Sequence, residues 1–199
     1  MNIPPEIEKL RFARISIPIN MECESYTMGD VFDFLGKSTG LTEEFIYNNT
    51  NPQVPQYPIY TASYEPIGYL PVDMVKDGER LKVCEGEVII IFRQGYAGLM
   101  YIPSETPFFA SEHTIPIRPK SEFREKLNCR WFIKYYEPEV LHYVTGKADS
   151  RNFSELAFKK IPLLLPPITW QNQCAALYEM MDKKLQGLED TLEKVSIQT

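Results

Sequence analysis

The stretch FKKIPLLLPPITWQ, residues 158–171, and the residues that follow it decide the organisation of the chain. Its apolar core is closed by two prolines, and Thr169 is a good N-cap for a helix. Beyond it, apolar residues recur at intervals of 3, 4, 4, 3, 4 and 3, at Cys174, Leu177, Met181, Leu185, Leu188, Leu192 and Val195. This spacing is typical of a coiled-coil seam with one four-residue slip. The sequence therefore predicts one long helix from about residue 169 to residue 195.

The expected helix is too long to be covered by a domain of this size. Roughly 27 residues at ~1.5 Å each give a rod of about 40 Å. We therefore expect its seam to bind a partner helix, most simply that of a second copy in a homodimer. The residues expected at this contact are Leu177, Met181, Leu185, Leu188, Leu192 and Val195. The alternative is an ordinary amphipathic helix folded back on the rest of the chain.

Upstream of this helix the pattern is mainly that of β-structure. Between residues 26 and 119, short apolar runs alternate with turn signals, which predicts strands at 31–35, 57–60, 67–70, 88–92, 99–102 and 113–117. Helices are expected at 6–10, at 121–136 with Ser121 as the cap, and at 154–158. The expected fold class is α+β. Residues 1–168 would form an irregular, partly rolled β-sheet domain with flanking helices, and residues 169–199 a long coiled-coil-type helix.

The expected helix at 121–136 has a basic edge. Phe123, Leu127 and Trp131 form an apolar stripe with a spacing of four residues. Lys126, Arg130 and Lys134 lie beside it. This local excess of positive charge is either an interface or simply a solvated helix face, and the sequence leaves both readings open.

The composition is that of an ordinary globular protein, with 199 residues, 44% of them hydrophobic, and a net charge of −6. This acidic balance opposes a free-standing, non-specific DNA binder but allows a domain that reads DNA inside a larger complex. No stretch approaches the ~18 consecutive apolar residues of a membrane helix. The first 24 residues carry several charges and no continuous apolar core, so we expect no signal peptide and a cytoplasmic protein.

The sequence has no recognisable catalytic or metal site. It lacks a P-loop, a Rossmann glycine pattern and a nucleophile elbow. Its four cysteines are far apart in sequence, which favours buried, reduced thiols over a zinc site. His113 and His142 are expected to be structural or exposed. We therefore predict a non-catalytic protein without a metal or another cofactor.

Residues 158–171 resemble the L-K-K-I-x-I-P-L-P-P-L-x-x-Q junction of Type I restriction-modification specificity subunits, which links a target-recognition domain to a long spacer helix. Further fragments in the same order resemble the family, at 28–32 (MGDVF), 57–60 (YPIY), 67–69 (IGY), 91–95 (IFRQG) and 109–114 (FASEHT). The resemblance covers about residues 26–195. Leu164 and Trp170 depart from the junction, where the family has proline and an acidic residue.

The resemblance implies a non-enzymatic subunit that selects a sequence in double-stranded DNA. Such a subunit holds DNA methyltransferase subunits over the DNA, sometimes with a restriction subunit attached. Most members have two recognition domains and two spacer helices, whereas this chain has one of each. It resembles a half-subunit or one half of a longer chain. Two such halves, paired through the long helix, would read a symmetric two-part target.

The residues expected to contact DNA lie in loops beside the resembling motifs. They are Lys37, Ser38 and Thr39; Thr61, Ser63 and Tyr64; Arg93, Gln94 and Tyr96; and, for phosphates, Arg118, Lys120 and Arg124. Arginine can bind a guanine edge and glutamine an adenine edge, each for ~1–3 kcal/mol of discrimination. Alternatively, Arg93 serves the fold by pairing with Glu87 or Glu112.

A second hypothesis keeps the fold but not the DNA. In it, the chain is a protein–protein adaptor that holds or masks an effector, which suits the acidic balance. The two hypotheses differ in salt dependence. A DNA reader that touches about six phosphates loses roughly a thousandfold in affinity between 50 and 200 mM salt, whereas an apolar contact barely changes.

Overall fold

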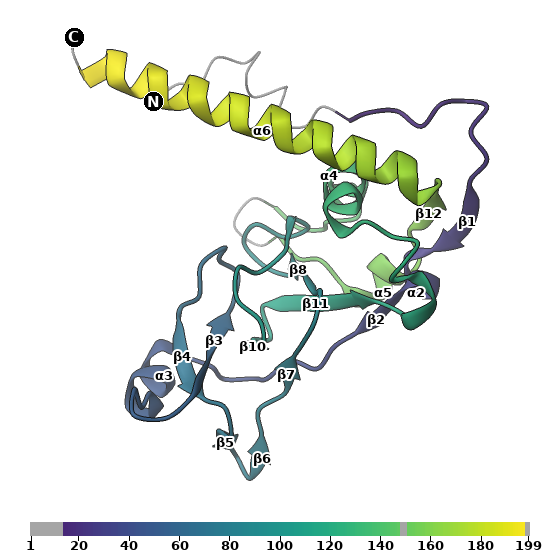
Figure 1. Ribbon diagram of the computed structural model, residues 1–199. Coiled ribbons are helices and arrows are strands. Elements are labelled where there is room, and N and C mark those ends of the chain that lie inside the picture. The colour runs from purple at the N-terminus through teal and green to yellow at the C-terminus, as the bar shows by residue number, and fades with distance from the viewer. Residues whose placement is uncertain (1–13, 148–150, 198–199) are drawn as a thin grey trace.

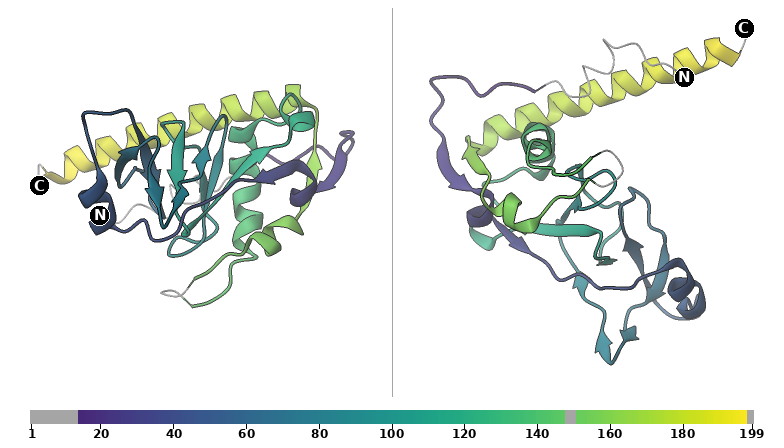
Figure 2. Two further views of the ribbon diagram at one scale, coloured as in Figure 1. Left: turned by 90° about the horizontal axis from the view of Figure 1, so that it is seen from below. Right: turned by 180° about the vertical axis from the view of Figure 1, so that it is seen from behind.

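The computed structural model describes residues 14–147 and 151–197, and the expected helix at 6–10 lies outside them. Figure 1 shows helix α6 (Ile168–Ile197) along one end of the molecule, with α4 (Cys129–Leu141) between α6 and the β-structure. The hairpin of β5 (Val75–Lys76) and β6 (Glu79–Arg80) lies at the opposite end, and the view from behind in Figure 2 shows the same order. The α+β fold class expected from the sequence is confirmed.

Two four-stranded sheets form the centre of the fold. The first has the order β2-β11-β8-β9, built from Phe32–Phe34, Thr114–Pro119, Ile89–Phe92 and Met100–Tyr101. The second has the order β4-β3-β10-β7, built from Gly68–Pro71, Gln56–Tyr60, Phe108–Ala110 and Val83–Cys84. All six strands expected from the sequence are present, although their ends shift. The strands β7 and β10 were not expected, because two or three residues give too short a pattern to recognise.

The strand β8 joins two hydrophobic cores. Ile89 and Ile91 belong to a core shared with α4 and α6, whereas Ile90 and Phe92 face a second core under β3 and β10. Successive side chains of a strand point to opposite faces, so an uninterrupted apolar run suits a strand that is covered on both sides.

Short elements complete the domain. They are β1 (Glu24–Thr27), which pairs with β12 (Pro162–Leu165), and the helices α2 (Met28–Val31), α3 (Glu43–Asn49) and α5 (Glu155–Lys159). The helix expected at 154–158 is thus confirmed as α5, with Ser154 as its N-cap. Three of the four cysteines are buried, and all four are free thiols. Among the described residues, no helix is long and apolar enough to cross a membrane.

The prediction of a helix at 121–136 is wrong at both ends, because α4 spans Cys129–Leu141. Residues Ser121–Phe123 form one 3-10 turn, and α4 begins only at Cys129. Asn128 is extended and caps α4 by accepting a hydrogen bond from the Trp131 N–H (2.9 Å), so the helix cannot continue back to Ser121. The spacing of four still identified buried side chains, since Phe123, Leu127 and Trp131 all lie in the core.

The long C-terminal helix begins one residue earlier than expected, so Thr169 lies in its first turn and is not its cap. The idea that its seam has no partner within the chain is wrong for its first half. Cys174 and Leu185 are buried, and Met181 packs against the core, whereas Leu177 and Leu188 are 46% and 50% exposed. The side chains of Leu192 and Val195 lie outside those that the structure describes.

Candidate nucleic-acid interface

Loops that are distant in sequence meet at the ends of β3 and β10. The backbone N–H of Ser38 donates to the Ala110 carbonyl (2.8 Å), and the N–H of Ser111 donates to the Tyr60 carbonyl (3.0 Å). The Ser111 hydroxyl donates to Thr61 Oγ1 at 3.0 Å. Two groups of residues expected to contact DNA, 37–39 and 61–64, are thus brought together around Ser111, a buried serine that the sequence did not single out.

The third group, after β8, joins the same surface. The N–H of Arg93 donates to the carbonyl of His113 (2.8 Å), and the Arg93 guanidinium donates to the carbonyl of Glu112 (3.5 Å). Arg93 therefore contacts the backbone of Glu112, one of its two expected partners, and not the carboxylate. The amide of exposed Gln94 is hydrogen-bonded through Oε1 to His113 Nδ1 (2.8 Å). This leaves the amino group of Gln94 to donate to an acceptor such as a base edge.

A carboxylate and a lysine connect the loop at 36–40 to Arg93. One oxygen of Glu112 accepts a hydrogen bond from the Gly40 N–H (2.9 Å), and the other has no partner among the described residues. Burial lowers the pKa of half-buried Lys37, and the nearby positive charge of Arg93 lowers it further, while Glu155 and Glu112 oppose this. The positive charges of Lys37 and Arg93 therefore oppose each other, and the carboxylates of Glu155 and Glu112 offset part of this repulsion.

Tyrosines border this surface on the side of β9. The Tyr64 ring packs edge-on against Phe92 and Tyr101, with 5.1 Å between ring centroids in each case. The carbonyl of Ser63 accepts a hydrogen bond from the Tyr101 hydroxyl (2.8 Å). Tyr96 is exposed on the loop after β8. These contacts fix the loop at 61–64 but leave half of the Tyr64 side chain open to solvent.

The residues expected to hold phosphates lie elsewhere. Arg118 is near the far end of β11 from His113 and donates to the Glu85 carbonyl (3.2 Å). Exposed Arg124 lines the same pocket as Arg118. The Lys120 ammonium donates to the carbonyls of Gly29 (2.9 Å) and Asp30 (2.8 Å), so it anchors α2 to the sheet.

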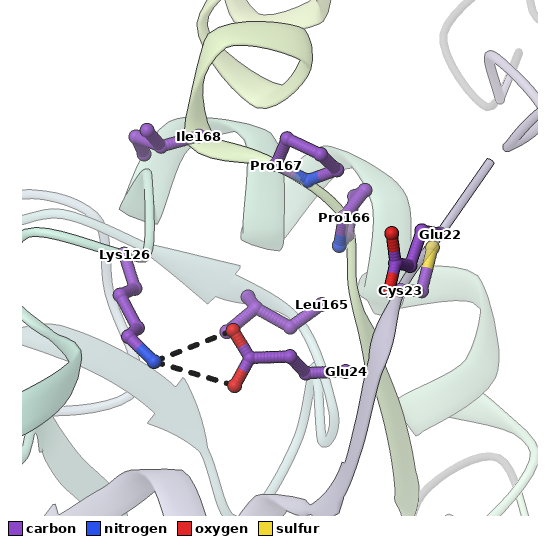
Figure 3. A pocket seen from close by; sticks show the side chains of 8 residues that line it. All are labelled: Glu22, Cys23, Glu24, Lys126, Leu165, Pro166, Pro167 and Ile168. Atoms are coloured by element: carbon purple, nitrogen blue, oxygen red, sulfur yellow. Dashed lines mark hydrogen bonds and ion pairs between the residues drawn. The ribbon is translucent and has the colours of Figure 1, made fainter.

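The basic edge of residues 126–134 faces acidic groups of the chain itself. Arg130 pairs with Glu179 (3.8 Å), and Lys134 pairs with Asp182 (2.9 Å), both on α6. The Lys126 ammonium lies 3.3 Å from both carboxylate oxygens of Glu24. Figure 3 shows this pair in a pocket where β12 leads into α6. The local basic excess therefore serves contacts within the fold.

The comparisons with known proteins agree on one family. The family model of the Type I restriction modification DNA specificity domain matches residues 20–195. One similar structure comes from work titled as the structural basis of complex assembly and conformational transition of the type I R-M system. It has a TM-score of 0.69 and 14% identity, and the match covers 98% of this chain and 48% of that chain. A search of curated proteins found no match.

Two further structures are specificity subunits by their titles. The HsdS subunit from Thermoanaerobacter tengcongensis has a TM-score of 0.64 and 14% identity, covering 94% of this chain and 46% of that chain. The S subunit from M. genitalium has a TM-score of 0.57 and 17% identity, covering 96% of this chain and 45% of that chain. At these identities the likeness shows the fold, and the chain spans about half the length of each structure.

Proposed function

We propose a function from one premise: the chain belongs to the family of Type I restriction modification DNA specificity domains. Domains of this family are non-catalytic recognition modules. We propose that this chain recognises a specific half-site in double-stranded DNA and presents it to DNA methyltransferase subunits in the cytoplasm. The recognition domain would comprise residues 1–168, and residues 169–199 would form the spacer helix.

The observation that carries this proposal is the meeting of loops 36–40, 61–64, 93–96 and 111–113 on one surface. Ser111 holds two of these loops, and the pairs Arg93–Glu112 and Gln94–His113 hold the others. Arg93 and Gln94 offer the donors that suit guanine and adenine edges in the major groove. A scaffold of buried strands that positions polar side chains on loops is what sequence reading needs, because base contacts must be held in fixed register.

The second part of the proposal concerns assembly. The chain spans about half of the two specificity subunits that it resembles. The exposed face of α6, with Leu177, Met180 and Leu188 each about half exposed, offers an apolar surface for a second helix. We propose that two copies pair through this face as a homodimer, with methyltransferase subunits and a restriction subunit docking on the paired helices. Such a dimer would place two identical readers at a fixed separation.

The proposed function is tested by mapping methylated bases across the genome of the source organism. The map is made with the gene, without it, and with it restored. We expect one methylated motif to be lost with the gene and to return with it. A two-part palindrome would support paired identical halves, and an asymmetric motif would indicate a second, different reader. A methylation map that does not depend on the gene would contradict DNA recognition and favour the adaptor hypothesis.

A further inference from the structure

A groove with a basic lining lies between the loop at 36–40 and the hairpin β5–β6. Its charged side chains are Lys37, Lys76, Arg80 and Lys82, against Asp77 and Glu79, in a groove of about 330 Å³. The lining therefore has a net charge of +2 in a chain of −6. The turn of the hairpin, Asp77–Gly78, has φ values of 54° and 83°, as a tight two-residue turn requires.

Gly36 and Gly40 have no side chains, which allows Lys82 and Lys76 to pack closely against the loop at 36–40. A Cβ on Gly36 would come within 2.5 Å of Lys82 Cδ, and a Cβ on Gly40 within 2.9 Å of the Lys76 ammonium. Lys76 also pairs with Asp77 (2.8 Å) and lies 5.5 Å from the centre of the Phe45 ring. The positive charges are therefore held at the walls of the groove by packing, which reduces the entropy lost when an anion binds.

The groove is continuous with the surface that carries Arg93 and Gln94. Ser38, which is buried, accepts a hydrogen bond from the Lys82 N–H (3.2 Å) on the groove side. On the other side, Gly40 donates to the carboxylate of Glu112 (2.9 Å). Lys37 belongs both to the groove, which it lines, and to the surface of Arg93, whose positive charge acts on it. The loop at 36–40 thus connects the proposed base-reading loops to the cationic groove.

We propose that the groove between residues 36–40 and the β5–β6 hairpin binds the phosphodiester backbone of the DNA duplex, beside the bases that the loop after β8 reads. This inference rests on the proposed function, and it assigns the phosphate contacts to Lys37, Lys76, Arg80 and Lys82 in place of Arg118 and Lys120. Phosphate contacts fix the register of a reader on the duplex, whereas base contacts provide the specificity. The hairpin lies at the end of the molecule away from α6, which leaves the helix free for partners (Figure 1).

The test uses the double variant Arg80→Gln, Lys82→Gln in the full chain. Glutamine keeps the Cβ, Cγ and Cδ atoms that in Lys82 lie over Gly36, so the variant removes charge without opening the packing. The matched control is Lys160→Gln, Lys183→Gln, which removes the same charge from two exposed lysines outside the groove. Fluorescence anisotropy measures the affinity of each protein for a labelled, mixed-sequence DNA duplex over a series of salt concentrations. Circular dichroism checks that each protein is folded.

We expect the slope of log Kd against log salt to fall by about 2 in the groove variant and to stay unchanged in the control. Equal slopes in the wild type and the groove variant would overturn the proposal. An equal decrease of this slope in both double variants would also overturn the proposal. The absence of duplex binding by the wild-type chain at low salt would overturn it too. Displacement of the duplex by poly-glutamate at an equal concentration of negative charges would also overturn the proposal. It would indicate that the groove is a site for acidic peptides. Because the duplex has no defined target, these outcomes are independent of the methylation map that tests DNA recognition.

Discussion

Gln171 provides the sharpest test of how the long helix is fixed to the recognition domain. Its side chain is fully buried in the first turn of α6. The amide oxygen accepts from the Asn128 N–H (2.9 Å), and the amide nitrogen donates to the carbonyls of Lys126 (2.8 Å) and Pro166 (2.7 Å). One side chain thus joins the start of α6, the end of the β12 junction and the cap of α4.

The magnitude of its effect follows from these three contacts. Each hydrogen bond contributes about 1 kcal/mol net, and a buried donor or acceptor left without a partner costs ~1–3 kcal/mol. Gln171→Ala breaks all three bonds and strands the Asn128 N–H, so we expect a loss of about 3–5 kcal/mol in the free energy of unfolding. For a chain of this size, 1 kcal/mol shifts Tm by ~2–4 °C, so the melting temperature should fall by roughly 6–20 °C.

Thermal and urea denaturation followed by circular dichroism measure this loss. The control is Gln173→Ala, which removes the same side chain from an exposed position two residues farther along α6 and should change Tm little. If Gln171→Ala and Gln173→Ala melt at the same temperature, the buried amide does not fix α6 to the domain. The explanation of the junction would then be wrong.

Three further predictions concern other regions. Burial raises the pKa of Glu137, so the ionised carboxylate opposes folding. The free energy of unfolding should therefore fall as pH rises from about 4.5 through that raised pKa. Urea midpoints measured over this pH range should fall less in the Glu137→Gln variant. Gly98→Ala should cost ~1–3 kcal/mol in thermal denaturation because φ is 89° and its Cβ would lie 2.7 Å from Val144 Cγ2, whereas Gly95→Ala, which meets open space, should cost less. With a net charge of −6, the isolated chain should bind DNA with a Kd weaker than about 10⁻⁶ M at physiological salt, and tight binding in anisotropy would contradict this.

Much of the fold could be predicted because burial leaves a periodic pattern. The apolar run at β8 and the spacing of Cys174, Leu185 and their neighbours identified a central strand and the long helix. The start of α4 was missed because the cap at Asn128 depends on a tertiary hydrogen bond from Asn128 to Gln171, 43 residues away. Spacing reports which side chains are buried, but not whether the backbone between them is one helix.

The proposed DNA-binding surface could be predicted only in part. Arg93 and Gln94 were proposed because they directly follow a buried strand in a family-like motif. His113 was not linked to Gln94, since they lie 19 residues apart and meet only through the pairing of β8 with β11. The groove at the hairpin was missed because Lys76, Arg80 and Lys82 are dispersed among acidic residues in the sequence. The hydrogen bonds of Lys120 to the Gly29 and Asp30 carbonyls were not expected, because nothing in a sequence shows that a lysine binds backbone carbonyls.

We propose that this chain reads a DNA sequence through the loops at the ends of β3, β8 and β10. The most direct test maps genome methylation in a strain whose only copy of the gene carries Gln94→Ala, with Gln173→Ala as the matched control. We predict that methylation persists but that the motif loses its requirement at one base pair, as expected for the loss of an amide contact worth ~1–3 kcal/mol. The control should keep the wild-type motif. A Gln94→Ala strain with the wild-type motif and full methylation would contradict base reading by this loop.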